Sequence, residues 1–286
     1  MNKMHLSRLI GQHEFWLGLL VVALAVGLSV STDEFLSLGN LTDVATSYAI
    51  LGILACGLFV VLISGGIDIS FPAMTAIAQY AMASWVIGHG GNFALALTIA
   101  IAVGLLLGLI NGFLVYWLRV PAIIITIATL NVYYGLLVYA TKGTWLYGFP
   151  DWFMNGINWF SFTAADGYDY GLTLPLLCLA AVIVFTAVLM NYTRLGRQVY
   201  AMGGNRDAAS RLGLNLLKLH FYVYGYMGIL AGVAAVVQAQ ITQSVAPNSL
   251  LGFELTVLAA VVLGGTSLIG GRGTLTGTLL GVILLA

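Results

Sequence analysis

Apolar segments of roughly membrane-spanning length recur along this sequence, and no other feature restricts its fold as strongly. The segments cover approximately residues 13–31, 44–63, 72–88, 93–117, 121–141, 171–190, 219–240 and 253–266. Charged residues make up only 7% of the chain. A soluble domain carries roughly 25%, because its surface needs them. We therefore predict an all-α, polytopic transmembrane helix bundle of about eight to ten spans, forming one domain over residues 1–286.

A further apolar segment begins at Leu275 and reaches the end of the sequence at Ala286. At about 1.5 Å per residue it extends roughly 18 Å, whereas the hydrocarbon core is about 30 Å thick. The segment is therefore either re-entrant or interrupted by the end of the sequence. We favour the second alternative and expect the C-terminal helices to be encoded beyond Ala286.

The distribution of basic residues predicts how the chain is oriented, because Lys and Arg collect on the cytoplasmic side. Residues 191–218 contain five Lys and Arg residues and one acidic residue, Asp207, so we expect a cytoplasmic loop. Residues 142–170 contain one lysine and three aspartates, so we expect them to lie outside. Counting helices between these loops places the N-terminus, with Lys3 and Arg8, in the cytoplasm.

Residue patterns for catalysis are absent from the sequence. The stretch Gly265–Gly270 is followed by Gly271-Arg272, where a phosphate-binding loop requires Lys and then Ser or Thr. The four histidines are scattered, and no nucleophile, metal or redox constellation is visible. The net charge of zero gives no sign of a nucleic-acid partner. We therefore interpret the chain as a conduit that uses no cofactor, rather than as an enzyme.

The predicted cytoplasmic loop contains the pattern of a short helix over residues 206–212. Asn205 can cap its start, Asp207 lies in the first turn, and Gly213 offers a left-handed stop. A short rigid helix here suits docking on a soluble partner, whereas a merely basic loop would only fix the orientation. The sequence leaves both interpretations open. The residues assigned to the docking role are Asn205, Arg206, Asp207, Ala208, Ala209, Arg211 and Gly213.

Polar side chains inside the apolar segments are candidates for a solute pathway. Many of them share helical faces, and neutral hydrogen-bonding groups suit an uncharged polyol better than an ion. For any single residue we favour the alternative, a hydrogen bond between helices worth about 0.6 kcal/mol on average. The candidates are Thr75, Gln79, Asn111, Thr126, Thr129, Asn131, Tyr133, Gln238 and Gln240.

Two glycine pairs interrupt apolar runs in a similar way; this is a weak internal similarity, for which duplication is the less favoured explanation. Val60-Val61-Leu62 precedes Gly65-Gly66, and Val261-Val262-Leu263 precedes Gly264-Gly265.

Asp68 follows the first glycine pair. A charged side chain at the bilayer centre costs about 2.5–3.5 kcal/mol on insertion scales. We therefore expect Asp68 to cap the start of the third helix at the membrane boundary, with Ser70 nearby and Pro72 in the first turn.

Three stretches that span nearly the whole chain carry a family resemblance. They are SGGIDIS at Ser64–Ser70; TRLGR at Thr193–Arg197 with GGNRDAA at Gly203–Ala209 and Gly213; and AVVLGGTS at Ala260–Ser267 with GGRG at Gly270–Gly273. In this order they resemble the permease subunits of bacterial ATP-binding-cassette importers for ribose, xylose, arabinose, galactose and autoinducer-2. Phe71-Pro72 departs from the family, which usually has small residues after the serine.

The resemblance implies a multi-pass, type II-like importer permease of the bacterial inner membrane, surrounded by lipid. A second permease subunit, identical or paired, would complete the pathway. A cytoplasmic ATP-binding subunit would hydrolyse ATP, and a periplasmic substrate-binding protein would deliver the sugar or autoinducer-2.

Two alternatives remain open. One is a branched-chain amino-acid permease of the same importer class. The other is an ion-coupled secondary transporter, which usually needs carboxylates within the membrane. Only Asp43, Asp68 and Glu254 are available for that role, and each lies near a predicted helix end.

Overall fold

A computed structural model describes residues 13–32, 34–155, 161–163 and 169–286 of the chain. Lys3 and Arg8, which the predicted orientation uses, lie outside these residues. The described part is helical apart from a small antiparallel hairpin, β1 (Ser161–Thr163) and β2 (Asp169–Gly171). The helices are α2 (His13–Ser31), α3 (Leu38–Ser47), α4 (Ala49–Ile63), α5 (Phe71–His89), α6 (Phe93–Leu118), α7 (Ala122–Thr141), α8 (Asp151–Met154), α9 (Leu174–Tyr192), α10 (Arg194–Gly204), α11 (Arg206–Arg211), α12 (Leu216–Thr242), α13 (Phe253–Leu263) and α14 (Leu275–Leu285).

The described helices confirm a transmembrane bundle but contain fewer full spans than the sequence predicts. Five of them, α2, α6, α7, α9 and α12, are long and apolar enough to cross a membrane. The pair α3 and α4, bent by 48°, raises the number to six. The 19-residue α5 has sufficient length, but polar residues such as Gln79 make it less apolar than those helices.

The predicted span 253–266 is wrong in length. The helix in this region, α13, has 11 residues and ends at Leu263, because Gly265 takes a left-handed conformation with φ of 88°. α14 also has 11 residues. Each helix is therefore about 17 Å long, roughly half the thickness of the hydrocarbon core. α13 and α14 pack closely against each other, and the absence of a side chain at Gly277 and Gly281 makes this possible. A Cβ at Gly277 would collide with the carbonyl oxygen of Gly264, and one at Gly281 would collide with that of Ala260.

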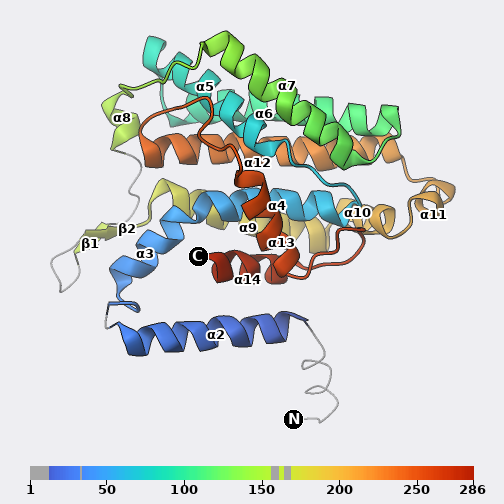
Figure 1. Ribbon diagram of the computed structural model, residues 1–286, viewed down its shortest axis with the longest axis horizontal. Helices are drawn as coiled ribbons and strands as arrows, with labels where there is room; N and C mark the ends of the chain where they lie inside the picture. The colour runs from blue at the N-terminus through green and yellow to red at the C-terminus, as the bar shows by residue number, and fades with distance from the viewer. Residues whose placement is uncertain (1–12, 33, 156–160, 164–168) are drawn as a thin grey trace.

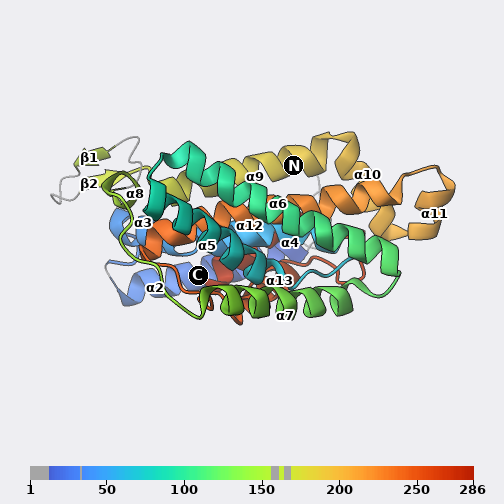
Figure 2. The same cartoon turned by 90° about the horizontal axis from the view of Figure 1, so that it is seen from above.

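The core of the bundle forms around α4 and α12. Every residue of α4 is buried, which its apolar side chains on all faces allow. Most of α12 is buried as well. α2 lies at the edge of the bundle beside α14, and Leu17 is its one buried residue (Figures 1 and 2).

Glycines allow α6 and α12 to cross with their backbones in contact. A Cβ added at Gly104 would collide with the carbonyl oxygen of Gly228, and one at Gly108 would collide with that of Tyr224. A Cβ at Gly232 would collide with the carbonyl oxygen of Ala100. Small residues promote such packing in lipid, where van der Waals contact replaces the hydrophobic effect as the driving force.

Different short elements lie at the two ends of the bundle. α10 and α11 lie at one end, and α8 with the β1–β2 hairpin lies at the other (Figures 1 and 2). At the second end, Leu146 and Val245 pair through their backbones, and the Phe149 and Phe153 rings stack with centroids 4.5 Å apart. The basic loop and the acidic loop of the sequence therefore emerge at opposite ends, as the predicted orientation requires.

Candidate coupling and translocation sites

The short helix α11 lies in the predicted loop and has the predicted cap. The side-chain oxygen of Asn205 accepts a hydrogen bond of 2.9 Å from the backbone N–H of Ala208. Gly213 has φ of 81°, and the next N–H, of Leu214, donates to the carbonyl oxygen of Ala209. The helix ends at Arg211, one residue earlier than predicted, because Leu212 forms the C-cap.

The side chains of α11 face two environments. Asn205, Arg206, Asp207, Ala208 and Arg211 are exposed, and they remain available to a second protein. Ala209 is buried within the chain, so it does not form part of the free surface that the sequence analysis assigned to it. The reason is geometric, since successive residues of a helix point about 100° apart.

The preceding helix α10 was not predicted, although its start carries a signal. Thr193 caps it, accepting a 3.1 Å hydrogen bond from the N–H of Gly196. One face is buried through Val199 and Met202, and the opposite face carries Arg194 and Arg197. α10 therefore connects the end of α9 to α11 as an amphipathic helix rather than as a loop.

Four glycines bring the end of α10 into backbone contact with two distant segments. A Cβ at Gly203 would collide with the carbonyl oxygen of Ile63, at the end of α4. A Cβ at Gly270 would lie 2.6 Å from Cα of Gly65, and one at Gly271 would lie 2.7 Å from Cα of Gly204. The N–H of Gly271 also donates a 2.9 Å hydrogen bond to the carbonyl oxygen of Ile63. We call Gly65, Gly203, Gly270 and Gly271 the glycine node.

Side-chain hydrogen bonds reinforce this junction from α10 and α2. The Tyr200 hydroxyl donates to the carbonyl oxygen of Gly273 at 2.9 Å. Burial raises the pKa of the Tyr200 hydroxyl, so it remains a protonated donor at neutral pH. The Thr274 hydroxyl donates to the carboxylate of Glu14 at 2.7 Å, and the His13 ring lies 2.9 Å from the carbonyl oxygen of Leu263. In the sequence, only the paired glycines pointed to this junction, and nothing pointed to these side-chain hydrogen bonds.

The two glycine breaks have the same backbone geometry. The N–H of Gly65 donates to the carbonyl oxygen of Leu62, and that of Gly265 donates to Val262. One residue later, Gly66 donates to Val61 and Thr266 donates to Val261. The φ angles of Gly65 and Gly265 are 84° and 88°. Both breaks are therefore glycine-dependent helix stops of the Schellman type, which satisfy the last carbonyl groups of α4 and α13.

Asp68 lies directly after the first break, within a buried polar cluster. One carboxylate oxygen, Oδ1, accepts hydrogen bonds from the backbone N–H of Ser70 at 2.8 Å and from its hydroxyl at 2.6 Å. The Asn111 amide donates to the Ser70 hydroxyl at 2.6 Å, and the Tyr133 hydroxyl donates to Asn111 Oδ1 at 3.1 Å. The Thr126 hydroxyl donates to the carbonyl oxygen of Ile67. Residues predicted separately on α6 and α7 thus meet the segment that precedes α5. The prediction that Asp68 caps α5 is wrong, because Ser70 is the N-cap residue and Asp68 accepts hydrogen bonds from Ser70 rather than from the first turn of the helix.

Within this part of the structure, several buried polar atoms have no hydrogen-bond partner among the described residues. They are Oδ2 of Asp68 and the Tyr224 hydroxyl; both amide atoms of the buried Gln79, about two turns further along α5, also lack one. Tyr224 was not singled out by the sequence. Its hydroxyl lies against Gly66, which leaves no room for a side chain at that position. Buried polar atoms are almost always paired in folded proteins, so these atoms are candidates for contact with a solute.

The remaining pathway candidates are not gathered at this cluster. Thr75 and Thr129 are buried and bond backbone carbonyl groups of their own helices, at Phe71 and Thr126. Asn131 is exposed on α7 and also bonds within its own helix, so the structure does not place it in the interior. The side chains of Gln238 and Gln240 are half-buried near the opposite end of α12.

Substitution of Asp68 separates its hydrogen-bonding role from its charge. Asp68→Asn keeps an acceptor oxygen for Ser70, so we expect a melting temperature and solute uptake close to those of the parent protein. Asp68→Leu leaves the Ser70 N–H and hydroxyl buried without an acceptor, which costs about 1–3 kcal/mol for each group. Thermal unfolding of the detergent-purified variants measures this difference. A normally folded Asp68→Asn protein that transports nothing would instead show that the charge is required.

Comparison with known proteins identifies relatives of this chain. Residues 40–286 match the family described as "Branched-chain amino acid transport system / permease component". The ribose import permease protein of Escherichia coli K12 is 32% identical over 267 residues, covering 93% of this chain and 81% of the relative. That of Bacillus subtilis 168 is 32% identical over 270 residues, covering 94% and 81%. The autoinducer 2 import system permease protein of Yersinia enterocolitica is 33% identical over 267 residues, covering 93% and 72%.

No solved structure matches the chain. The family match covers most of the sequence, and the described helices are those of a multi-pass membrane protein. The chain therefore belongs to the branched-chain amino acid transport system permease family, and it is a permease component of an ATP-binding-cassette importer rather than an ATPase.

Proposed function

We propose that this permease conducts a neutral, sugar-like solute of the ribose or autoinducer-2 class across the bacterial inner membrane. The observation that carries the proposal is the composition of the buried polar cluster. Among the described residues, its members are neutral hydroxyl and amide groups together with one carboxylate, Asp68. The free amide atoms of Gln79 are available to hydroxyl groups of such a solute.

The same composition argues against a zwitterionic solute, although the family takes its name from branched-chain amino acids. A cationic side chain is the strongest side-chain partner for the carboxylate of a zwitterion. No lysine or arginine is buried among the described residues, and Asp68 is already engaged by Ser70. The relatives that import ribose or autoinducer 2 support the neutral class.

The energy source in this proposal is a cytoplasmic ATP-binding subunit that docks on α11. The helix is capped at both ends and lies at one extremity of the bundle, where its exposed face is open (Figure 1). The glycine node lies at the adjoining end of α10 and connects it to the first helix break and to the loop that follows the second. A displacement of α11 would therefore move rigidly joined backbone rather than a flexible loop.

The remaining parts of the assembly follow from the importer class. A second permease subunit, identical or paired, would complete the pathway, and a periplasmic binding protein would deliver the solute at the α8 end. We retain the type II-like architecture and the cytoplasmic N-terminus for the complete permease. We also retain about eight to ten spans, by counting α5 and the short helices α13 and α14 together with the five or six candidate spans.

Transport by the reconstituted importer tests the proposed function. With its ATP-binding subunit and binding protein in proteoliposomes, we expect radiolabelled ribose uptake to require ATP, to stop with vanadate and to continue with an uncoupler. Loss of uptake with the uncoupler while ATP is maintained would indicate ion coupling. Uptake of leucine without uptake of ribose or autoinducer-2 would indicate the amino-acid alternative.

Cysteine cross-linking tests the docking role of α11. After replacement of Cys56 and Cys178, we expect Ala208→Cys to cross-link to the ATP-binding subunit, with a yield that changes with nucleotide. Ala208→Trp should abolish uptake and loosen this association, whereas Ala208→Ser should do neither. Gly213→Val should weaken the helix stop by about 1 kcal/mol or more, and Gly213→Asn should be tolerated. Free labelling of Ala208→Cys in the assembled complex, with and without ATP, would exclude docking here.

Adjacent glycines provide a matched test of the glycine node. A Cβ at Gly203 collides with the Ile63 carbonyl oxygen, whereas one at Gly204 meets nothing within 4 Å. We therefore expect Gly203→Ala to lower the ratio of solute transported to ATP hydrolysed, while the Ala208→Cys cross-link persists. Gly204→Ala should leave that ratio at the parental value. Equal transport ratios for the two variants would show that the node does not transmit movement.

A further inference from the structure

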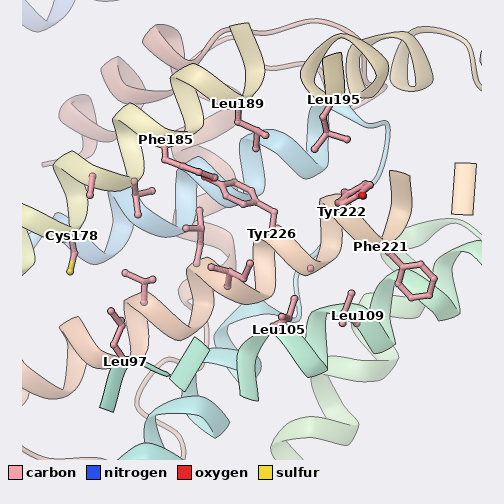
Figure 3. A pocket seen from close by; sticks show the side chains of 16 residues that line it. Leu97, Leu105, Leu109, Cys178, Phe185, Leu189, Leu195, Phe221, Tyr222 and Tyr226 are labelled. Carbon is pink, nitrogen blue, oxygen red and sulfur yellow. The ribbon is translucent and has the colours of Figure 1, made fainter. Parts of the chain in front are cut away.

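A large apolar groove lies on the outside of the bundle, away from the polar cluster. It has a volume of about 730 Å3 and is bordered by α6, α9 and α12 (Figure 3). It runs from Leu97 and Cys178 at one end to Leu195 and Tyr222 at the other. Its size is that of a ligand site, since such clefts usually measure about 300–1,000 Å3.

The groove is lined partly by exposed side chains, among them Phe185 and Tyr222, so it lies at the surface of the bundle, and it has the length of one leaflet. Its three bordering helices are all long and apolar enough to span the membrane. On α9 the lining extends from Cys178 to Leu189, and on α12 it extends from Phe221 to Val233. Each stretch rises roughly 17 Å, close to half of the ~30 Å hydrocarbon core. An extended acyl chain of a single leaflet therefore matches the groove.

Two basic residues lie next to lining residues at the α10 end of the groove. Arg194 precedes the lining residue Leu195 at the start of α10. Lys218 lies one turn before the lining residue Tyr222 on α12, and therefore on the same helical face. Both basic side chains are exposed. Residues 174–242 contain a single acidic residue, Asp207, so little negative charge is present to neutralise them.

We propose that this groove binds an anionic phospholipid of the inner leaflet. One acyl chain lies between α9 and α6, and Arg194 and Lys218 bind the phosphate of the headgroup. Tyr222 places its ring at the interface, where aromatic side chains with a polar tip are favoured. Basic clusters between transmembrane helices on the cytoplasmic side recognise anionic headgroups in this way.

A second copy of the chain fits this surface less well than a lipid. In a two-fold symmetric interface the same patch meets itself, so the basic residues of the two copies would face one another. A lipid phosphate neutralises these charges, whereas a second copy doubles them.

Native mass spectrometry of the purified, delipidated full chain tests the proposal with defined lipids. We expect phosphatidylglycerol to bind more tightly than phosphatidylcholine with identical acyl chains. Arg194→Gln and Lys218→Gln should each reduce that preference roughly fivefold. Arg119→Gln removes one charge at the same membrane face, away from the groove lining, and should leave the preference unchanged. Equal binding of the two lipids, or equal effects of the three substitutions, would overturn the proposal.

A groove-filling substitution tests the position of the acyl chain. Ala181 lines the groove on α9, whereas Ala102 is exposed on α6 outside it. Ala181→Trp should displace bound phosphatidylglycerol, and Ala102→Trp should not. Inorganic phosphate should not compete with the lipid, because it has no acyl chain. Competition by phosphate would show that the site recognises only the anionic headgroup and does not bind an acyl chain. Loss of dimers with unchanged lipid binding in Ala181→Trp would assign the groove to a second copy.

Discussion

Hydrogen bonding of the backbone inside hydrocarbon is the constraint on which this structure depends. Every peptide group in the membrane needs a partner within the chain, so an interrupted helix is tolerated only where its last carbonyl groups are satisfied. The breaks after Ile63 and Leu263 meet this condition with the same pair of turn hydrogen bonds and a left-handed glycine. These two stops allow the chain to turn at the junction where α4, α10 and α13 end.

Close contact between backbones is the second organising feature, and it follows from the same environment. Without a hydrophobic effect between helices, stability depends on contact area, and glycine increases it by removing the side chain. Gly104 and Gly108 allow α6 to pack on α12, and Gly203 allows α10 to pack on the end of α4. The first contact holds the bundle together. The second connects the exposed helix α11 to the interior, which gives the proposed ATPase contact a rigid route to the pathway.

The interior of the bundle contains a hydrogen-bonded polar cluster, whereas its outer surface is mainly apolar. Asp68 and Ser70, in the segment before α5, are linked by hydrogen bonds to Asn111 on α6 and Tyr133 on α7, so the carboxylate is held at the helix break by neutral donors. On the outside, the groove between α6 and α9 has an apolar lining, and its nearest charges lie at its cytoplasmic end. The proposed neutral solute and the proposed anionic lipid would therefore be matched by different chemistry, polar in the buried cluster and apolar with basic residues at one end in the groove.

The sequence alone determined what depends on local residue types. The apolar lengths predicted a membrane bundle, Asn205 and Gly213 predicted α11, and three motifs indicated the importer family. It did not determine the length of α13, the helix α10 or the burial of Ala209, because these depend on which surfaces meet. The glycine node and the Asp68 cluster unite residues up to about two hundred positions apart. Only the tertiary structure decides such contacts, since a glycine or an asparagine specifies that a close partner is possible and not which partner it will be.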